Sequence, residues 1–165
     1  MINVAILGYG TIGSGVAQII DDNNALLEKR IGDGIAVKRI LDLRDFPGDK
    51  NESKLTKSID DIVNDARIDI VVECMGGVEP AHTVVKDSLL AGKSVTTSNK
   101  ALVAVYGSEL ISIAREKSIN FMFEASVGGG IPIIRPILSC LTAEDILEIT
   151  GILNGTTNFM MTKMI

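Results

Sequence analysis

The sequence G-x-G-x-x-G at residues 8–13 constrains this chain more than any other feature, because it links a short apolar run to a longer amphipathic one. The apolar run at residues 2–7, broken only by Asn3, is typical of a buried strand, and apolar side chains recur at helical spacing over residues 11–29. A glycine-rich turn between a strand and a helix directs the free N–H groups of the helix toward a bound diphosphate. In this context the motif predicts a dinucleotide site rather than a simple turn.

Each glycine of the motif has an expected role. Gly8 permits the tight turn, Gly10 lets a pyrophosphate approach the backbone, and Gly13 lets the helix pack closely on the strand. The N–H groups of Thr11 and Ile12 are expected to point at the phosphates, helped by the helix dipole. The motif alone does not choose the redox chemistry, since a flavoprotein would bind FAD with the same loop.

The rest of the chain alternates short β-rich runs with helical stretches, which indicates an α/β fold, a Rossmann-like doubly wound parallel sheet. We expect strands at residues 2–7, 35–41, 69–73, 94–97, 120–123 and 146–153. Helices are expected at residues 11–29, 59–66, 79–91, 101–117, 133–141 and 156–165, with a polar loop at 42–57. Right-handed crossovers would place the carboxyl ends of the strands along one edge of the sheet.

The end of the second expected strand carries opposite charges, Asp42 and Arg44. An acid at this position would hydrogen-bond the ribose 2′-hydroxyl of NAD, whereas an arginine would pair with the 2′-phosphate of NADP. Both residues are present, so the sequence leaves the choice open, and ordinary solvated loop charges remain an alternative.

The character of the chain changes after Glu124. We assign residues 1–127 to an NAD(P)-binding Rossmann domain and residues 128–165 to the start of a second α/β domain used for dimerisation and catalysis. Gly128-Gly129-Gly130 indicates a crossing between the two. The apolar helix expected from residue 156 has no stop signal, so we expect the chain to be a truncated piece.

Composition excludes several classes of protein. The 165 residues carry a formal net charge of −5 without a basic stripe, which argues against nucleic-acid and anionic-membrane partners. No apolar stretch is long enough to span a bilayer, and no signal peptide precedes the first strand. The two cysteines, Cys74 and Cys140, fit a reducing cytoplasm rather than a disulfide framework, and Cys140 is expected in the core.

Four further segments lie mainly at the ends of expected strands. Together with the glycine loop, and in their order along the chain, they resemble homoserine dehydrogenases. The segments are residues 71–77 with 80–81, 91–101, 124–132 and 151–158. The resemblance implies NAD(P)-dependent interconversion of aspartate 4-semialdehyde and homoserine, a small-molecule reaction of amino-acid biosynthesis, by a protein that is usually a homodimer. It also implies acidic substrate ligands and a second lysine further along, so we expect this chain to bind cofactor without full turnover.

Lys100 is the residue singled out for catalysis. It is expected just past a strand end, where its ammonium could orient the substrate or relay a proton at the carbonyl, and the resemblance implies the same region. A solvated lysine at a helix start is the alternative, although the positive end of the helix dipole is a poor place for a cation. The expected neighbours on the cofactor side are Cys74, Met75, Gly76, Ser98 and Asn99.

The resemblance also implies a possible monovalent cation, such as sodium, bound chiefly through main-chain carbonyls. The matching residues are Glu124, Val127, Gly129 and Ile131. A glycine-rich loop can present carbonyl oxygens closely. The alternative is a simple bend at the domain crossing.

Two other functions remain open. A semialdehyde dehydrogenase that forms a thioester on Cys74 would need a base beside the thiol, and His82 is the only histidine, expected to be structural or solvated. A non-catalytic NAD(P)-sensing module would bind cofactor but would lack a pocket converging on Lys100.

Overall fold

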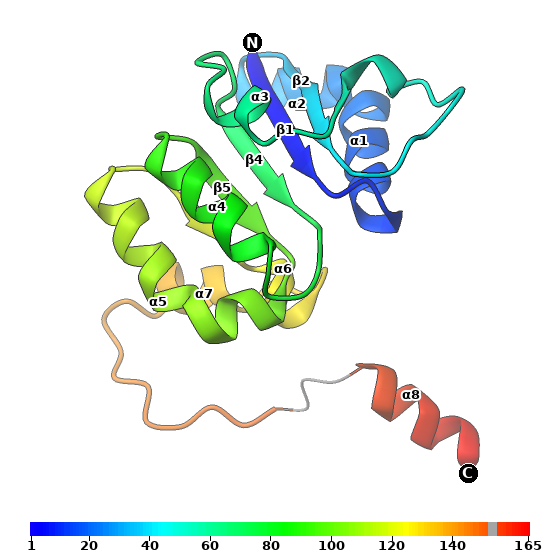
Figure 1. The fold of residues 1–165 in the computed structure, drawn as a ribbon. Helices are drawn as coiled ribbons and strands as arrows, with labels where there is room; N and C mark the ends of the chain where they lie inside the picture. The colour runs from blue at the N-terminus through cyan, green and yellow to red at the C-terminus, as the bar shows by residue number, and fades with distance from the viewer. Residues whose placement is uncertain (152–154) are drawn as a thin grey trace.

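The computed structural model describes residues 1–151 and 155–165 and contains a six-stranded, wholly parallel sheet (Figure 1). The strands are β1 (Ile2–Leu7), β2 (Ile35–Leu41), β3 (Leu55–Thr56), β4 (Ile70–Glu73), β5 (Ser94–Thr97) and β6 (Phe121–Met122). Their order, β3-β2-β1-β4-β5-β6, is that of a dinucleotide-binding Rossmann fold, with the order reversing beside β1. The predicted fold class is confirmed.

Helices connect these strands and cover both faces of the sheet. They are α1 (Thr11–Asp22), α2 (Asn24–Ile31), η1 (Glu52–Lys54), α3 (Asp60–Val63), α4 (Ala81–Leu90), α5 (Lys100–Glu116), α6 (Ala125–Gly128), α7 (Ile134–Cys140) and α8 (Gly155–Met164). Figure 1 shows α4 and α5 packed side by side, in agreement with their many mutual contacts.

Strand β1 lies between two hydrophobic clusters, and its alternating side chains divide between them. Val4 and Ile6 pack with α1 on one face, while Ala5 and Leu7 pack with residues of α3, α4 and α5 on the other. A strand buried on both faces must be apolar at every position that packs, which is why residues 4–7 form a continuous apolar run. Both clusters are built from residues 4–121, so the sheet has a core of its own.

Several predicted elements differ from the structure within this unit, and the helix expected over 59–66 is shorter, at Asp60–Val63. The single helix expected over 11–29 is broken at Asn23, whose side-chain Nδ2 donates to the Ile19 carbonyl 3.0 Å away. Such a bond competes with continuation of the helix. The loop expected over 42–57 contains η1 and the two-residue strand β3, which is too short to leave a periodic signal.

The last part of the chain packs little against the sheet. Residues 139–151 are all exposed, and α8 stands apart from the other helices in Figure 1. Cys140 is exposed, so its predicted place in the core is wrong; α7 presents that side chain to solvent. The strand expected over 146–153 does not form at 146–150, and residues 152–154 lie outside the described residues. No helix of the described ranges is long and apolar enough to cross a bilayer.

Candidate functional site

The glycine loop forms the turn that the sequence predicts. Gly8 has a φ of +91°, a conformation that L side chains rarely adopt, and a Cβ there would lie 3.0 Å from the Cys74 carbonyl oxygen. A Cβ on Gly13 would lie 1.9 Å from the Gly8 carbonyl oxygen, so only glycine lets α1 approach the loop. The space beside Gly10 is open except for the Arg44 guanidinium at 3.8 Å. The backbone is therefore accessible where a diphosphate would bind.

The start of α1 supplies the donors for such a diphosphate. Gly10 is the N-cap, and no side chain caps the helix. The first N–H groups of any helix lack intrahelical acceptors and carry partial positive charge. Thr11 and Ile12 occupy this exposed first turn, as predicted.

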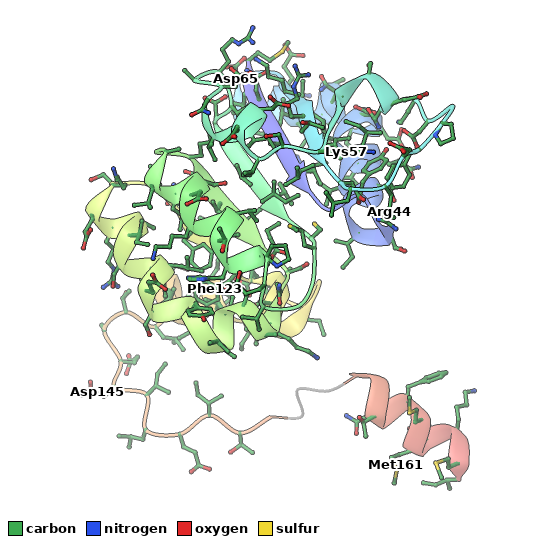
Figure 2. All side chains as sticks on the ribbon, viewed as in Figure 1. Arg44, Lys57, Asp65, Phe123, Asp145 and Met161 are labelled. Atoms are coloured by element: carbon green, nitrogen blue, oxygen red, sulfur yellow. The ribbon has the colours of Figure 1, made fainter. Side chains whose placement is uncertain are left out.

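A pocket of about 520 Å³ lies between the glycine loop and the end of β2. Its apolar wall includes Leu43, Ile59 and Val84, which could receive a flat ring system such as adenine. Arg44 and Lys57 line its polar side, and Figure 2 shows both side chains on the loops that follow β2 and β3. Lys57 was not predicted, because the short strand that positions it was not recognised.

Asp42 lies in this pocket but its carboxylate is fully engaged. Oδ1 accepts from Arg44 N at 2.9 Å and from Arg44 Nε at 3.0 Å. Oδ2 accepts from Tyr9 N at 2.7 Å and from Arg44 Nη2 at 2.8 Å. The hydrogen bonds from the Arg44 side chain hold the pKa of Asp42 far below its ordinary value. A carboxylate has about four lone-pair sites, and all are occupied here.

A second pocket, of about 410 Å³, lies between the ends of β4 and β5. Its wall contains all the residues predicted for the nicotinamide side, which are Cys74, Met75, Gly76, Ser98, Asn99 and Lys100, together with Ile12, Gly77 and Ala101. Cys74 and Met75 also line the first pocket, so the two adjoin along the carboxyl edge of the sheet. The predicted cofactor residues are thereby brought together on one edge.

Lys100 is the first residue of α5 and its side chain is exposed at this pocket. No ion pair joins it to any other residue that the structure describes. The helix behind it is capped by Asn99, whose side-chain oxygen accepts from Leu102 N at 3.1 Å. An ammonium group at the positive end of a helix, without an internal partner, can bind an anion or a polarised carbonyl oxygen.

Cys74 has the environment of an inert thiol. Burial, and to a smaller extent the negative charge of Glu73, raise the pKa of this thiol to about 12. His82, the residue that could activate it, is engaged elsewhere: its ring nitrogens lie 3.1 Å from Glu79 Oε1 and 2.9 Å from Glu109 Oε2, and the ring stacks on Tyr106. His82 is structural, and the geometry gives no support to a thioester on Cys74.

Glu124 has a local structural role. Its carboxylate accepts backbone hydrogen bonds from Ile133, from Ile134 at 2.8 Å and from Arg135 at 2.7 Å, and it thereby caps the start of α7. These bonds, chiefly that from Ile133, lower its pKa. Any cation at this segment would therefore depend on main-chain carbonyls rather than on this carboxylate. No cluster of three acidic, histidine or cysteine side chains suited to a metal occurs among the described residues.

Comparison with known proteins places these features in a family. Residues 8–124 match the model of the homoserine dehydrogenase NAD-binding domain, and residues 132–165 match that of the homoserine dehydrogenase family. The chain is 43% identical to homoserine dehydrogenase of Bacillus subtilis and 41% identical to that of Pseudomonas aeruginosa, with 99% of the chain aligned in each case. It spans only 39% and 38% of the length of these relatives.

Solved structures agree with this relationship. A homoserine dehydrogenase from Thiobacillus denitrificans superposes with a TM-score of 0.89 at 42% identity, over 99% of this chain and 38% of that one. A hyperthermophilic archaeal homoserine dehydrogenase in complex with NADPH superposes with a TM-score of 0.68 at 28% identity, over 82% of this chain and 47% of that one.

Proposed function

The chain belongs to the homoserine dehydrogenase family, and from this premise we propose that it binds NAD(P) along the carboxyl edge of its sheet. We further propose that the protein interconverts aspartate 4-semialdehyde and homoserine. The observation that carries the proposal is the shared edge: the open backbone at Gly10, the first turn of α1 and the Lys100 pocket lie along it. A dinucleotide is an elongated ligand that needs such a continuous edge.

The residues fit a dinucleotide from end to end. The pocket beside Leu43 and Ile59 would hold the adenosine half, and the N–H groups of Thr11 and Ile12 would bind the diphosphate. The pocket beside Met75 and Lys100 would hold the nicotinamide and the substrate. Bound NAD(P) supplies hydride transfer. The Lys100 ammonium would bind the substrate's carbonyl oxygen and stabilise negative charge developing there.

The charges at the adenosine end favour NADP over NAD. Asp42 has no lone pair left for a ribose hydroxyl, because Arg44 and Tyr9 occupy all of them. Arg44 keeps guanidinium N–H groups beyond the two bound to Asp42. Among the described residues, Lys57 forms an ion pair with the exposed Asp45 alone, at 2.8 Å, a kind of pair that contributes little. Two cations would thus be available to a 2′-phosphate.

Calorimetric titration of the chain with NADP and with NAD tests this proposal. We expect NADP to bind roughly tenfold more tightly, because hydrogen bonds between charged groups are worth ~1.5–3 kcal/mol. Arg44→Ala should remove most of that preference. Arg67→Ala is the matched control, because Arg67 bonds Asp65 in the same way. Figure 2 shows Asp65 at the opposite end of the sheet from Arg44. Failure to bind either dinucleotide would refute the proposal, and tighter binding of NAD would refute the preference.

From the family resemblance we also propose a site for a monovalent cation, formed by Glu124, Val127, Gly129 and Ile131. Its support is the glycine-rich bend, in which Gly129 has a φ of +60° and can present carbonyl oxygens. If sodium binds there, the melting temperature of the chain should be higher in sodium chloride than in choline chloride at equal ionic strength. Equal melting temperatures in the two salts would count against the site.

A further inference from the structure

Glu73, the last residue of β4, carries a carboxylate that is completely buried. A charged group in the interior requires hydrogen-bond partners, because removing it from water is costly. Oε1 accepts from the backbone N–H of Met75 at 2.7 Å, and Oε2 accepts from the hydroxyl of Thr97 at the end of β5. Glu73 therefore joins the ends of two neighbouring strands.

Backbone N–H donors orient this network. The backbone N–H of Asn99 donates to Thr97 Oγ1 at 2.9 Å, so the hydroxyl proton of Thr97 is free to point at Glu73. Asn99 in turn donates through Nδ2 to the Gly77 carbonyl. The Glu73 carboxylate thus accepts one hydrogen bond from the loop after β4, through Met75, and one from the end of β5, through Thr97.

Both loops are walls of the pocket that contains Lys100. Met75 and Gly77 come from the loop after β4, whereas Asn99 comes from the turn after β5 and directly precedes Lys100. Glu73 itself is not exposed to the pocket. We propose that Glu73 is a positioning residue. Acting through Thr97 and Asn99, it holds the nicotinamide-side wall of the pocket and the start of α5, at Lys100, in fixed positions relative to each other. This inference rests on the proposed binding of NAD(P) described above.

The adenosine end of the site is held by different contacts. Asp42, Tyr9 and Arg44 fix one another there, and none of them bonds to Glu73 or Thr97. A defect at Glu73 should therefore affect the nicotinamide half of the cofactor more than the adenosine half. A general structural role predicts no such difference.

Titration with the whole cofactor and with one half of it separates these possibilities. The ligands are NADPH and adenosine 2′,5′-bisphosphate, which lacks the nicotinamide ribose and ring. The variants are Glu73→Gln, Thr97→Val and the control Thr97→Ser. Glutamine keeps the size of glutamate but places an NH₂ group against either the Met75 N–H or the Thr97 hydroxyl. Valine removes the hydroxyl, whereas serine retains it.

We expect Glu73→Gln and Thr97→Val to bind NADPH roughly tenfold more weakly, the loss typical of a hydrogen bond to a charged group. They should bind adenosine 2′,5′-bisphosphate as the unchanged chain does. Thr97→Ser should restore NADPH affinity. The fluorescence emission of bound NADPH, which reports on the nicotinamide environment, should shift in the first two variants only.

Three results would overturn the inference while leaving the proposed function intact. One is unchanged NADPH affinity in Glu73→Gln. Another is an equal loss for both ligands, with a lower melting temperature, which would indicate a general structural role. The third is a serine variant as impaired as the valine variant. Failure of the unchanged chain to bind NADPH would instead overturn the proposed function as well as this inference.

Discussion

At the scale of single residues, environment separates side chains that look equally reactive in the sequence. Cys74 and Lys100 both follow a strand and both line the same pocket. Burial keeps the Cys74 thiol protonated by raising its pKa to about 12, so it is a poor nucleophile at neutral pH. Lys100 is exposed and unpaired within the described part of the chain, so its charge is available to a ligand.

Lys100→Ala should therefore reduce turnover with little change in cofactor affinity. In a protein of the relatives' full length that contains this sequence, kcat for homoserine oxidation should fall by ~10²-fold or more, the loss expected when a charge at the reacting carbonyl is removed. Steady-state kinetics and NADPH titration together measure the two effects. Lys117→Ala is the control, because Lys117 lies beyond the other end of α5. Unchanged kcat in Lys100→Ala would refute the proposed role of Lys100, whereas cofactor binding without any turnover in the unchanged protein would favour a non-catalytic sensing module.

At the scale of elements, the unit that matters most is β1, the glycine loop and α1. The loop must turn sharply at Gly8. The helix must then pack, at Gly13, directly against the Gly8 carbonyl. Backbone in contact with backbone cannot yield as a flexible side chain does. The close approach also fixes the direction in which the first N–H groups of α1 point.

Gly13→Ala should both destabilise the chain and weaken dinucleotide binding. The new Cβ would lie 1.9 Å from the Gly8 carbonyl oxygen, so α1 must move away from β1. Overpacking of this kind costs ~1–3 kcal/mol. Gly15→Ala is a matched control on the same helix, because nothing lies within 4 Å of its Cβ. Thermal unfolding and NADPH titration should show a loss for the first variant and a neutral or stabilising effect for the second.

At the scale of the whole molecule, carboxylates with lowered pKa values link stability to pH. Asp42, Asp65, Glu109 and Glu124 all have pKa values below their ordinary range, because each accepts hydrogen bonds from basic side chains or backbone N–H groups. A carboxyl group that is more acidic in the folded chain stabilises it above the unfolded pKa of about 4. That contribution is lost as the pH falls toward the folded value.

The free energy of unfolding should consequently fall on acidification below about pH 5. Urea denaturation at a series of pH values between neutral and strongly acid measures this slope. Asp42→Asn should make the slope shallower, because asparagine does not titrate and the lowered pKa of Asp42 then no longer contributes to the pH dependence. Stability that rises as the pH falls would contradict the assigned directions.

Much of the fold and part of the site follow from the sequence. Strand β1 is buried on both faces and therefore has a continuous apolar run at residues 4–7, and both β1 and β2 were predicted at their observed bounds. The glycine loop and the residues after β4 and β5 were located because parallel strands bring their carboxyl ends to one edge. β3, two residues long, carries no periodicity, and so Lys57 beside it was missed.

Other features depend on contacts between distant parts of the chain. Whether Asp42 can accept a ribose hydroxyl is decided by Arg44 and by the backbone of Tyr9, 33 residues away. The link between Glu73 and Thr97 forms only because β4 and β5 are paired in register. Local sequence determined which segments became strands, turns and helices, because periodicity and glycine conformation act over a few residues. The tertiary structure decided which charges are buried, paired or free, because burial and pairing depend on neighbours that only the folded sheet brings together.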